Sequence, residues 1–306
     1  MRGPFLQKRI FWKHLFLCPE CISGSVNLWV CWLKAIAGNR RRGGYEDGGF
    51  AHDLLPSVTR VVVARPIASL YPPLHHQNVA LRTAFLDRAL YAELRGLSAD
   101  EEAVVTVLGA GFDARAVRMA THVAPGEEEG GKEPALTGIG KVSWAEVDLP
   151  HVVEQKRRLL ARLVRRRPAV SGAVDALVQC SANLTRTDEA RTALRQALAP
   201  LAQTCQGGED GGRGVAIFVL EALLIYVPPT AASSLLRACV DEAAAAGAAH
   251  VSIVFADRLP EVDGCSMDSA RDALGAAHLE LDEASWLPKP GLARHMGVAR
   301  WARQAV

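Results

Sequence analysis

The sequence predicts an α/β fold in which helices cover both faces of a mostly parallel, doubly wound sheet. Short apolar runs alternate along the chain with segments of helical length, which is typical of successive βαβ units. One apolar run, 104–108, passes directly into Gly109-Ala110-Gly111, as a buried strand does when it ends in a tight turn before a helix. The length of 306 residues suits one large domain of this kind with an extension.

Residues 1–50 are expected to form a poorly ordered or targeting-like extension, and residues 51–306 the folded domain. Up to position 44 this extension carries eight Lys and Arg residues against Glu20 alone, and its uncharged segment 21–33 is too short to span a bilayer. Two interpretations stay open: a poorly ordered extension, including one from a wrongly assigned gene start, and an organelle-targeting peptide. We therefore expect a cytoplasmic protein, with organelle targeting as the alternative, and no membrane association.

The first half of the domain begins with a helix. Apolar residues at helical spacing predict it over 78–97, and the first strand follows at 104–108. A short helix is expected at 114–122 and a surface loop at 125–140. A second strand is expected at 142–149 and a helix at 151–167, with a solvated basic face: Lys156, Arg157, Arg158 and Arg165 to Arg167.

The second half repeats the alternation of strands and helices. Strands are expected at 173–180, 215–220 and 250–255, and helices at 187–198 and 230–246 lie between them. A helix at 267–281 and a closing strand at 293–301 complete the predicted domain.

Distinctive residues follow the expected strands where each strand ends. Gly109 and Gly111 follow the first strand, Asp148 ends the second, Asn183 follows the third, and Glu221 follows the fourth. In an open parallel sheet the ligand lies over these carboxyl ends, at the point where the strand order reverses. We therefore expect these residues to line one binding site.

The residue types indicate which ligand this site accepts. Asp148 can accept both hydroxyls of a ribose, and Asn183 can hydrogen-bond an adenine edge. Glu221 can accept from an ammonium group, and Arg82 on the preceding helix can hold a carboxylate with two hydrogen bonds. These four groups together indicate S-adenosylmethionine. A dinucleotide fits less well, because the turn lacks the third glycine of the GxGxxG pattern.

Each residue also has a purely structural interpretation. Gly109 and Gly111 could simply form a turn, and Asp148 could cap the helix that begins near Pro150. Asn183 could be a turn residue, Glu221 a charge at a helix end and Arg82 part of a solvated face. The order of suitable polar groups at successive strand ends favours the binding interpretation.

Five segments, taken in order, resemble the leucine carboxyl methyltransferase family. They are RTAFLD at 82–87, VLGAGFDAR at 107–115, EVDLP at 146–150, SANL at 181–184 and LEALLIYVPP at 220–229. This family includes the enzyme that methyl-esterifies the C-terminal leucine of type 2A protein phosphatase, a tRNA wybutosine-synthesis methyltransferase and many bacterial O-methyltransferases. The resemblance implies the Rossmann-like fold of class I methyltransferases and S-adenosyl-L-methionine as cofactor.

The same resemblance implies a role for each site residue. It places the methionine carboxylate on Arg82, the methionine backbone region on Gly109 and Gly111, the ribose on Asp148, the adenine on Asn183 and Leu184, and the amine side on Glu221. The family usually has Asp where this chain has Asn183, so we expect weaker adenine binding through one remaining hydrogen bond. The regions before Arg82 and beyond Pro260 match less clearly, which leaves the methyl acceptor open.

The expected function is methyl transfer to a carboxylate, on either a protein C-terminal peptide or a small molecule. A carboxylate is ionised at neutral pH and needs no general base, so no catalytic residue is assigned. The alternatives are a degenerate, non-catalytic member that binds the cofactor and an oxidoreductase that uses a dinucleotide. A net charge of +2 offers no footprint for nucleic acid, and the lone CxxC pair of Cys18 and Cys21 does not make a metal site.

Overall fold

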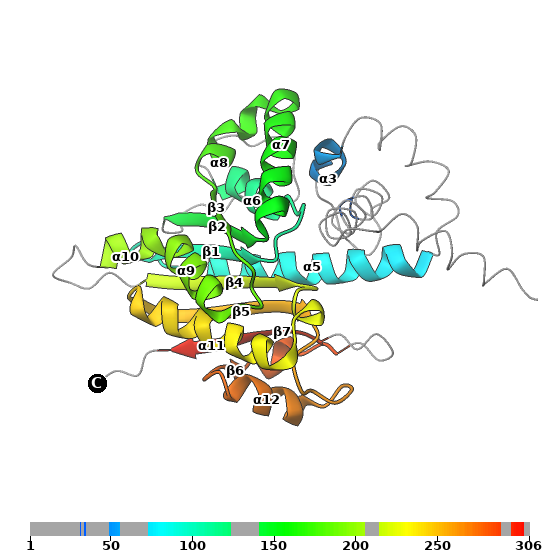
Figure 1. Cartoon of the computed structure of the whole chain (residues 1–306), viewed down its shortest axis with the longest axis vertical. Coiled ribbons are helices and arrows are strands. Elements are labelled where there is room, and N and C mark those ends of the chain that lie inside the picture. The colour runs from blue at the N-terminus through cyan, green and yellow to red at the C-terminus, as the bar shows by residue number, and fades with distance from the viewer. Residues whose placement is uncertain are drawn as a thin grey trace, which may run out of the picture.

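The structure, a computed structural model, describes residues 31, 34, 49–55, 73–123, 141–205, 214–288 and 295–302. Its centre is a seven-stranded sheet in the order β3-β2-β1-β4-β5-β7-β6 (Figure 1). The strands are β1 (Glu102–Leu108), β2 (Val142–Asp148), β3 (Val178–Ser181), β4 (Gly214–Glu221), β5 (Ala248–Asp257), β6 (Glu280–Leu281) and β7 (His295–Ala302). The pairs among β1 to β5 are parallel, and β7 is antiparallel to both β5 and β6.

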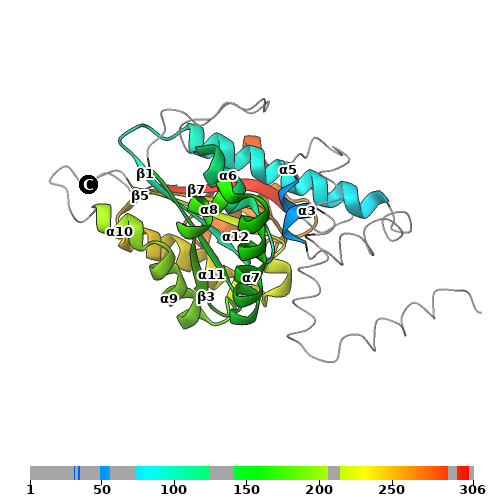
Figure 2. The same cartoon turned by 90° about the horizontal axis from the view of Figure 1, so that it is seen from above.

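Helices lie on both faces of this sheet (Figure 2). One face carries α5 (Pro73–Arg95), α6 (Arg115–Val123) and α7 (Pro150–Arg166). The other carries α9 (Thr187–Ala197), α10 (Ala199–Cys205), α11 (Pro229–Ala245) and α12 (Met267–Gly275). The shorter elements are α3 (Phe50–Leu54), α8 (Ser171–Asp175), η3 (Pro168–Val170), η4 (Leu224–Tyr226) and η5 (Glu283–Ser285).

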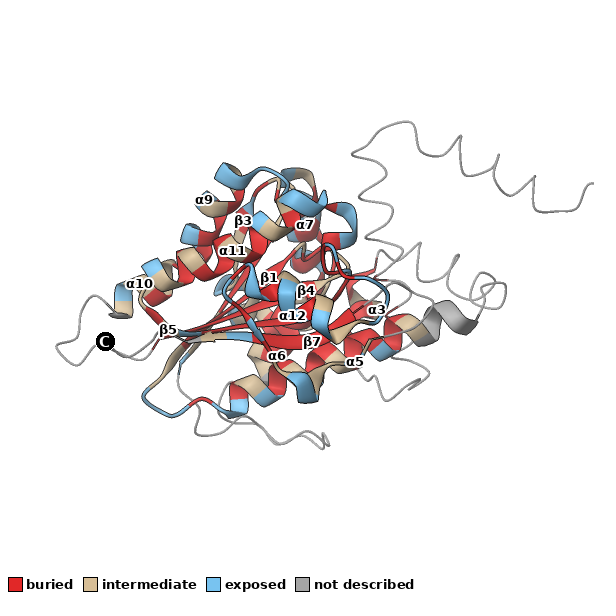
Figure 3. Ribbon diagram, turned by 90° about the horizontal axis from the view of Figure 1, so that it is seen from below, coloured by how far each residue is buried: buried red, intermediate tan, exposed pale blue. Residues whose placement is uncertain are grey.

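The central strands are buried on both sides (Figure 3). Along β1, Val104 and Leu108 pack with α9 and α11, whereas Val105 and Val107 pack with α5 and α6. Successive side chains of a strand point to opposite faces, so a strand covered on both faces must be apolar throughout. The parallel central strands, with helices on both faces, confirm the predicted doubly wound α/β class. β7 is the strand that runs antiparallel to both of its neighbours.

Two predicted elements are wrong in extent. Residues 171–175 are the helix α8 rather than part of a strand, and β3 begins only at Val178. β3 is an edge strand that pairs with β2 alone over four positions, so little of its length is held extended. The helix expected over 267–281 ends at Gly275; the chain then turns at His278, where φ is 60°, and pairs with β7 as β6.

The expected basic face of 151–167 is only partly solvated. Arg157, Arg158 and Arg165 are exposed. Lys156, however, is 2% exposed, and its Nζ donates to Glu146 Oε1 on β2 at 2.7 Å. The prediction for Lys156 is therefore wrong. Arg167 is only partly exposed, and its Nε donates to Asp53 of α3 at 2.6 Å.

Two described residues upstream of position 49 pack against the folded unit. Cys31 is 2% exposed and belongs to a core cluster with residues of α3, α6 and α7. Lys34 is 3% exposed. The boundary at residue 50 stays a prediction, because most of 1–48 lies outside the described residues, as do Cys18, Cys21 and the expected loop at 125–140.

Within the described ranges, no helix is both long enough and apolar enough to cross a membrane.

Candidate active site at the carboxyl ends of the strands

The turn after β1 requires glycine at two positions. Gly109 has φ of 62° and Gly111 has φ of 48°, a left-handed conformation that costs little only for glycine. A Cβ on Gly109 would lie 2.8 Å from Leu223 Cδ1, so the close approach of the loop after β4 also excludes a side chain there. The two glycines therefore allow the turn after β1 to pack closely against the loop after β4.

Asp148, at the end of β2, holds this turn in place. Its Oδ2 accepts from the Gly111 N–H at 2.6 Å, and its Oδ1 accepts from the Leu149 N–H at 2.7 Å. Burial raises the pKa of Asp148, and the two N–H donors counteract that rise in part. Each carboxylate oxygen keeps further acceptor capacity, so the side chain remains suited to ribose hydroxyls.

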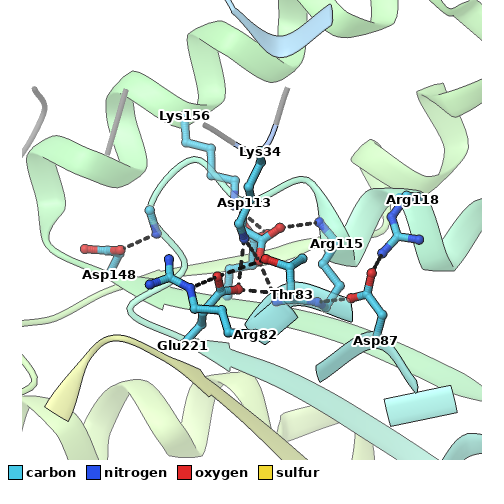
Figure 4. A network of polar contacts seen from close by, with 12 residues as sticks. Lys34, Arg82, Thr83, Asp87, Asp113, Arg115, Arg118, Asp148, Lys156 and Glu221 are labelled. Carbon is cyan, nitrogen blue, oxygen red and sulfur yellow. Dashed lines mark hydrogen bonds and ion pairs between the residues drawn. The ribbon is translucent and has the colours of Figure 1, made fainter. Parts of the chain in front are cut away.

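Glu221, at the end of β4, is the centre of a buried ionic cluster (Figure 4). Its Oε1 accepts from Arg82 Nε at 2.7 Å and from Thr83 Oγ1 at 3.3 Å. Its Oε2 accepts from Lys34 Nζ and from Arg115 Nη2, each at 2.9 Å. Both oxygens are thus fully used by protein donors.

The cluster continues from Arg115 into α5 and the glycine turn. Arg115 donates to Asp113 Oδ2 at 2.5 Å and to Asp87 Oδ1 at 2.6 Å, and Arg118 also donates to Asp87. Lys34 Nζ lies 3.0 Å from Asp113 Oδ2. The cluster therefore joins Lys34 to α5, α6 and β4.

The cluster keeps its carboxylates ionised. Burial alone would raise the pKa of Glu221, but Lys34, Arg82 and Arg115 outweigh it and hold that pKa well below its ordinary value. Burial likewise opposes ionisation of Asp113, yet Arg115 and Lys34 lower its pKa to about 2. Both groups are therefore charged acceptors at neutral pH and offer no base for proton abstraction.

Arg82 has hydrogen-bond donors that no described protein group uses. Its only hydrogen bond among the described residues is the one from Nε to Glu221, although its side chain is just 6% exposed. The two terminal nitrogens therefore form an unused fork, and in the view of Figure 4 the guanidinium lies between Glu221 and Asp148. A guanidinium held in this way suits a carboxylate that binds through two parallel hydrogen bonds.

The turn after β3 differs from the sequence-based expectation. Asn183 Oδ1 accepts from Thr185 N at 3.1 Å and from Thr185 Oγ1 at 2.7 Å. An amide oxygen has two acceptor positions, so both are taken within the turn. The oxygen that we expected to accept from an adenine amino group is therefore engaged within the turn, and contact of Asn183 with adenine stays a prediction. Among the described residues, the Nδ2 donors and the Leu184 N–H make no hydrogen bond to protein.

The loop after Glu221 is fixed by a carboxylate that the sequence reasoning missed. Asp257, the last residue of β5, accepts from the N–H groups of Leu223, Leu224 and Ile225 at 2.5, 2.8 and 3.1 Å. Burial raises the pKa of Asp257 despite these donors. The sequence could have indicated Asp257, because it is an acidic residue at the end of a strand, as are Asp148 and Glu221.

Other members of the ionic cluster were also missed. Asp87, Asp113 and Arg115 lie within two of the quoted segments, but no role was assigned to them. Lys34 lies in the stretch that was taken for an extension, and no local pattern distinguishes it from the other basic residues there. Only the folded structure shows that it reaches Glu221, 187 positions further along the chain.

The sequence also offers four candidates for the acceptor side, Tyr226, Lys289, Arg294 and His295, with packing or solvated charge as an equally open interpretation of each. Tyr226 is 71% exposed and Ile225 is 43% exposed, on the loop that Asp257 holds. His295 is instead buried and structural: its Nδ1 accepts from Leu259 N, and its Nε2 donates to Gly264 O. Lys289 and Arg294 lie outside the described residues.

The described residues fit an S-adenosylmethionine-like group. Arg82 offers a free fork for a carboxylate, Asp148 offers acceptor capacity for a diol, and the Leu184 N–H is available for a ring nitrogen. Glu221 fits its expected role less well, because its oxygens are occupied by four protein donors.

Comparisons with solved structures find distant likenesses. A pericyclic reaction enzyme matches with a TM-score of 0.42 and 16% identity, over 93% of this chain and 68% of that one. Magnesium protoporphyrin IX methyltransferase from Synechocystis PCC 6803, with bound S-adenosylmethionine, matches with a TM-score of 0.39 and 11% identity, over 89% and 97% of the two chains. Human N-acetylserotonin methyltransferase, in complex with S-adenosylmethionine, matches with a TM-score of 0.37 and 11% identity, over 84% and 66%.

The sequence comparisons are more decisive. No curated protein matches the chain. The family model described as leucine carboxyl methyltransferase matches residues 28–240, which is more than half of the sequence. This range contains every residue of the ionic cluster, from Lys34 to Glu221. The chain therefore belongs to the leucine carboxyl methyltransferase family of S-adenosylmethionine-dependent methyltransferases.

Proposed function

We propose that this methyltransferase transfers its methyl group to a carboxylate oxygen, on a protein C-terminus or on a small molecule. The observation that carries the proposal is that the two carboxylates of the described ionic cluster that contact Lys34 are not poised as bases. Glu221 and Asp113 are both held ionised by Lys34 and Arg115. These two carboxylates, whose pKa values are lowered, are therefore not poised to accept a proton from an acceptor group. A nucleophile that is already ionised needs no such acceptor.

The cofactor would be held by groups of this chain. Arg82 would bind the methionine carboxylate through its unused terminal nitrogens, and Glu221 would orient Arg82 rather than contact the ammonium directly. Asp148 would bind the ribose hydroxyls, while Asn183 and Leu184 would contact the base. The two glycines, Gly109 and Gly111, would leave room for the methionine backbone.

The bound sulfonium supplies a methyl group that is already activated toward nucleophiles. The acceptor carboxylate forms the new O–CH3 bond as the S–CH3 bond breaks, and the electron pair stays on sulfur, so the products are a methyl ester and the thioether. The protein's contribution is then to align the acceptor oxygen and to exclude water. The exposed Ile225 and Tyr226, on a loop fixed by Asp257, are suited to contact an acceptor.

The chemistry of the product tests this proposal. Purified protein is incubated with tritiated-methyl S-adenosylmethionine and either a peptide ending in a free leucine carboxylate or a panel of small carboxylic acids. The peptide's C-terminal amide is the matched control acceptor. Methyl esters release volatile tritiated methanol in alkali, whereas methyl ethers and methylated amines do not.

Alkali-labile label on a free carboxylate, but not on the amide, is the expected result. Label that resists alkali would contradict a carboxylate acceptor while leaving the methyltransferase assignment intact. Cofactor binding without turnover on any acceptor would favour the degenerate, non-catalytic alternative, for which the occupied Asn183 oxygen is the structural argument.

A further inference from the structure

We propose that the base pocket after β3 recognises a purine through donors alone, so that it does not distinguish a 6-amino purine from a 6-oxo purine. This inference rests on the proposed cofactor-binding site. It concerns Asn183, which stands where an acidic residue would accept from the amino group of adenine.

The orientation of the Asn183 amide is fixed by its neighbour. The Thr185 N–H lies 3.1 Å from Asn183 Oδ1, and a backbone N–H can only donate. The atom that faces it must therefore be the oxygen, and the Nδ2 group must point the other way. The Thr185 hydroxyl, at 2.7 Å, occupies the second acceptor position of the same oxygen.

The acidic residue nearest to this turn is also engaged. Glu189 Oε2 accepts from the Asn183 N–H at 2.9 Å, and Glu189 Oε1 lies 3.1 Å from Arg186 Nε. The Asn183 carbonyl oxygen accepts from the Arg186 N–H at 2.9 Å. Within the described residues, the Leu184 N–H and the Asn183 Nδ2 group make no hydrogen bond to protein. Asn183 and Leu184 thus keep donors that no described protein group uses, and our proposal assigns these donors to the purine.

Two adjacent donors do not favour either purine. Adenine offers a ring acceptor to one donor but presents its amino group, itself a donor, to the other. A 6-oxo purine offers a carbonyl acceptor at that position, but its adjacent ring nitrogen carries a hydrogen that faces the remaining donor. Each base therefore gains one hydrogen bond and meets one mismatch, so we expect similar affinities.

The test compares S-adenosylhomocysteine with S-inosylhomocysteine, which differ only at position 6 of the base, by calorimetry on the full chain. For the unaltered protein we expect dissociation constants within about threefold of each other, because neither base gains a net hydrogen bond. Asn183→Asp replaces the Nδ2 donor with a charged acceptor, so it should create a preference of about tenfold or more for the adenosyl ligand. Asn183→Ala removes both the mismatch with the adenine amino group and the hydrogen bond to the 6-oxo group, so it should shift the ratio toward the adenosyl ligand by less than Asn183→Asp does.

Two results would overturn the inference alone: a preference of more than about tenfold for the adenosyl ligand in the unaltered protein, or no gained preference in Asn183→Asp although that variant binds and melts normally. Failure of the unaltered protein to bind either ligand would overturn the proposed cofactor site, and the inference with it.

Discussion

At the scale of single residues, the site shows why one charged group is not equivalent to another. Arg82 uses only Nε to reach Glu221, so its planar end stays available. Lys34 reaches the same carboxylate with a single ammonium group that is also 3.0 Å from Asp113. The two cations therefore differ in what they can still bind: Arg82 keeps two terminal nitrogens in a planar fork, whereas Lys34 shares a compact ammonium group between two carboxylates.

The first prediction separates charge from geometry at Arg82. Arg82→Lys keeps the positive charge but loses the second parallel hydrogen bond, so S-adenosylhomocysteine should bind about tenfold more weakly. The measurement is isothermal titration calorimetry. Arg271→Lys is the matched control, because Arg271 lies on α12 and, within the part of the chain that the structure describes, its ion pairs are with Asp268 and Glu283. Equal affinity in Arg82→Lys and Arg271→Lys would exclude Arg82 from carboxylate binding.

At the scale of elements, the loop after β4 depends on a neighbouring strand for its shape. Ala222 has φ of 54°, a conformation that a non-glycine residue adopts only when its surroundings impose it. Asp257 at the end of β5 supplies that restraint by accepting from three successive N–H groups of the loop. The position of Glu221, one residue before Ala222, thus depends on the pairing of β4 with β5.

The second prediction concerns this restraint. Asp257→Ala leaves the N–H groups of Leu223, Leu224 and Ile225 without their acceptor, so the free energy of unfolding should fall by about 2–3 kcal/mol. Urea unfolding followed by circular dichroism measures the loss. Asp268→Ala, at a side chain that is 86% exposed, should change stability by less than about 0.5 kcal/mol. A loss of similar size in both variants would argue against a structural role for Asp257.

The element scale also shows what a sequence can predict. The strands were recognisable because burial on both faces leaves continuous apolar runs, and the polar residues at their ends followed from topology. Lys156 was misread although its signal was present: it follows Val152 by four positions and precedes Leu159 and Leu160 by three and four, so it lies on the inward face of α7. The arginines next to Lys156 in the sequence led us to predict a solvated basic face instead.

The ionic cluster could not be predicted in the same way. Its members come from segments far apart in the sequence, and their pairing depends on how α5, α6 and β4 pack rather than on any local pattern. Residue types alone suggested that Arg82 and Glu221 would each bind the ligand. The structure instead pairs them with each other, since a buried carboxylate is stable only when its charge is compensated.

At the scale of the whole molecule, this cluster makes stability depend on pH in a defined direction. The pKa of Asp113 is about 2 in the folded chain, below its ordinary value of 3.8, because Arg115 and Lys34 outweigh its burial. A carboxyl group with a lowered pKa stabilises the fold above its unfolded pKa, and this contribution is lost as pH falls through the folded pKa. Asp148, Glu146 and Asp257 have raised pKa values and act in the opposite sense.

The third prediction isolates Asp113 from these opposing groups by comparison with Asp113→Asn, in which position 113 cannot ionise. The stability advantage of the unaltered chain over this variant should be constant above about pH 5 and should shrink by about 2 kcal/mol as pH falls from about 4 to 2. Urea unfolding of both proteins over this pH range gives the difference, in which the contributions of groups distant from position 113 cancel. An advantage that does not change with pH would mean that the Arg115 and Lys34 pairs do not stabilise the ionised form of Asp113.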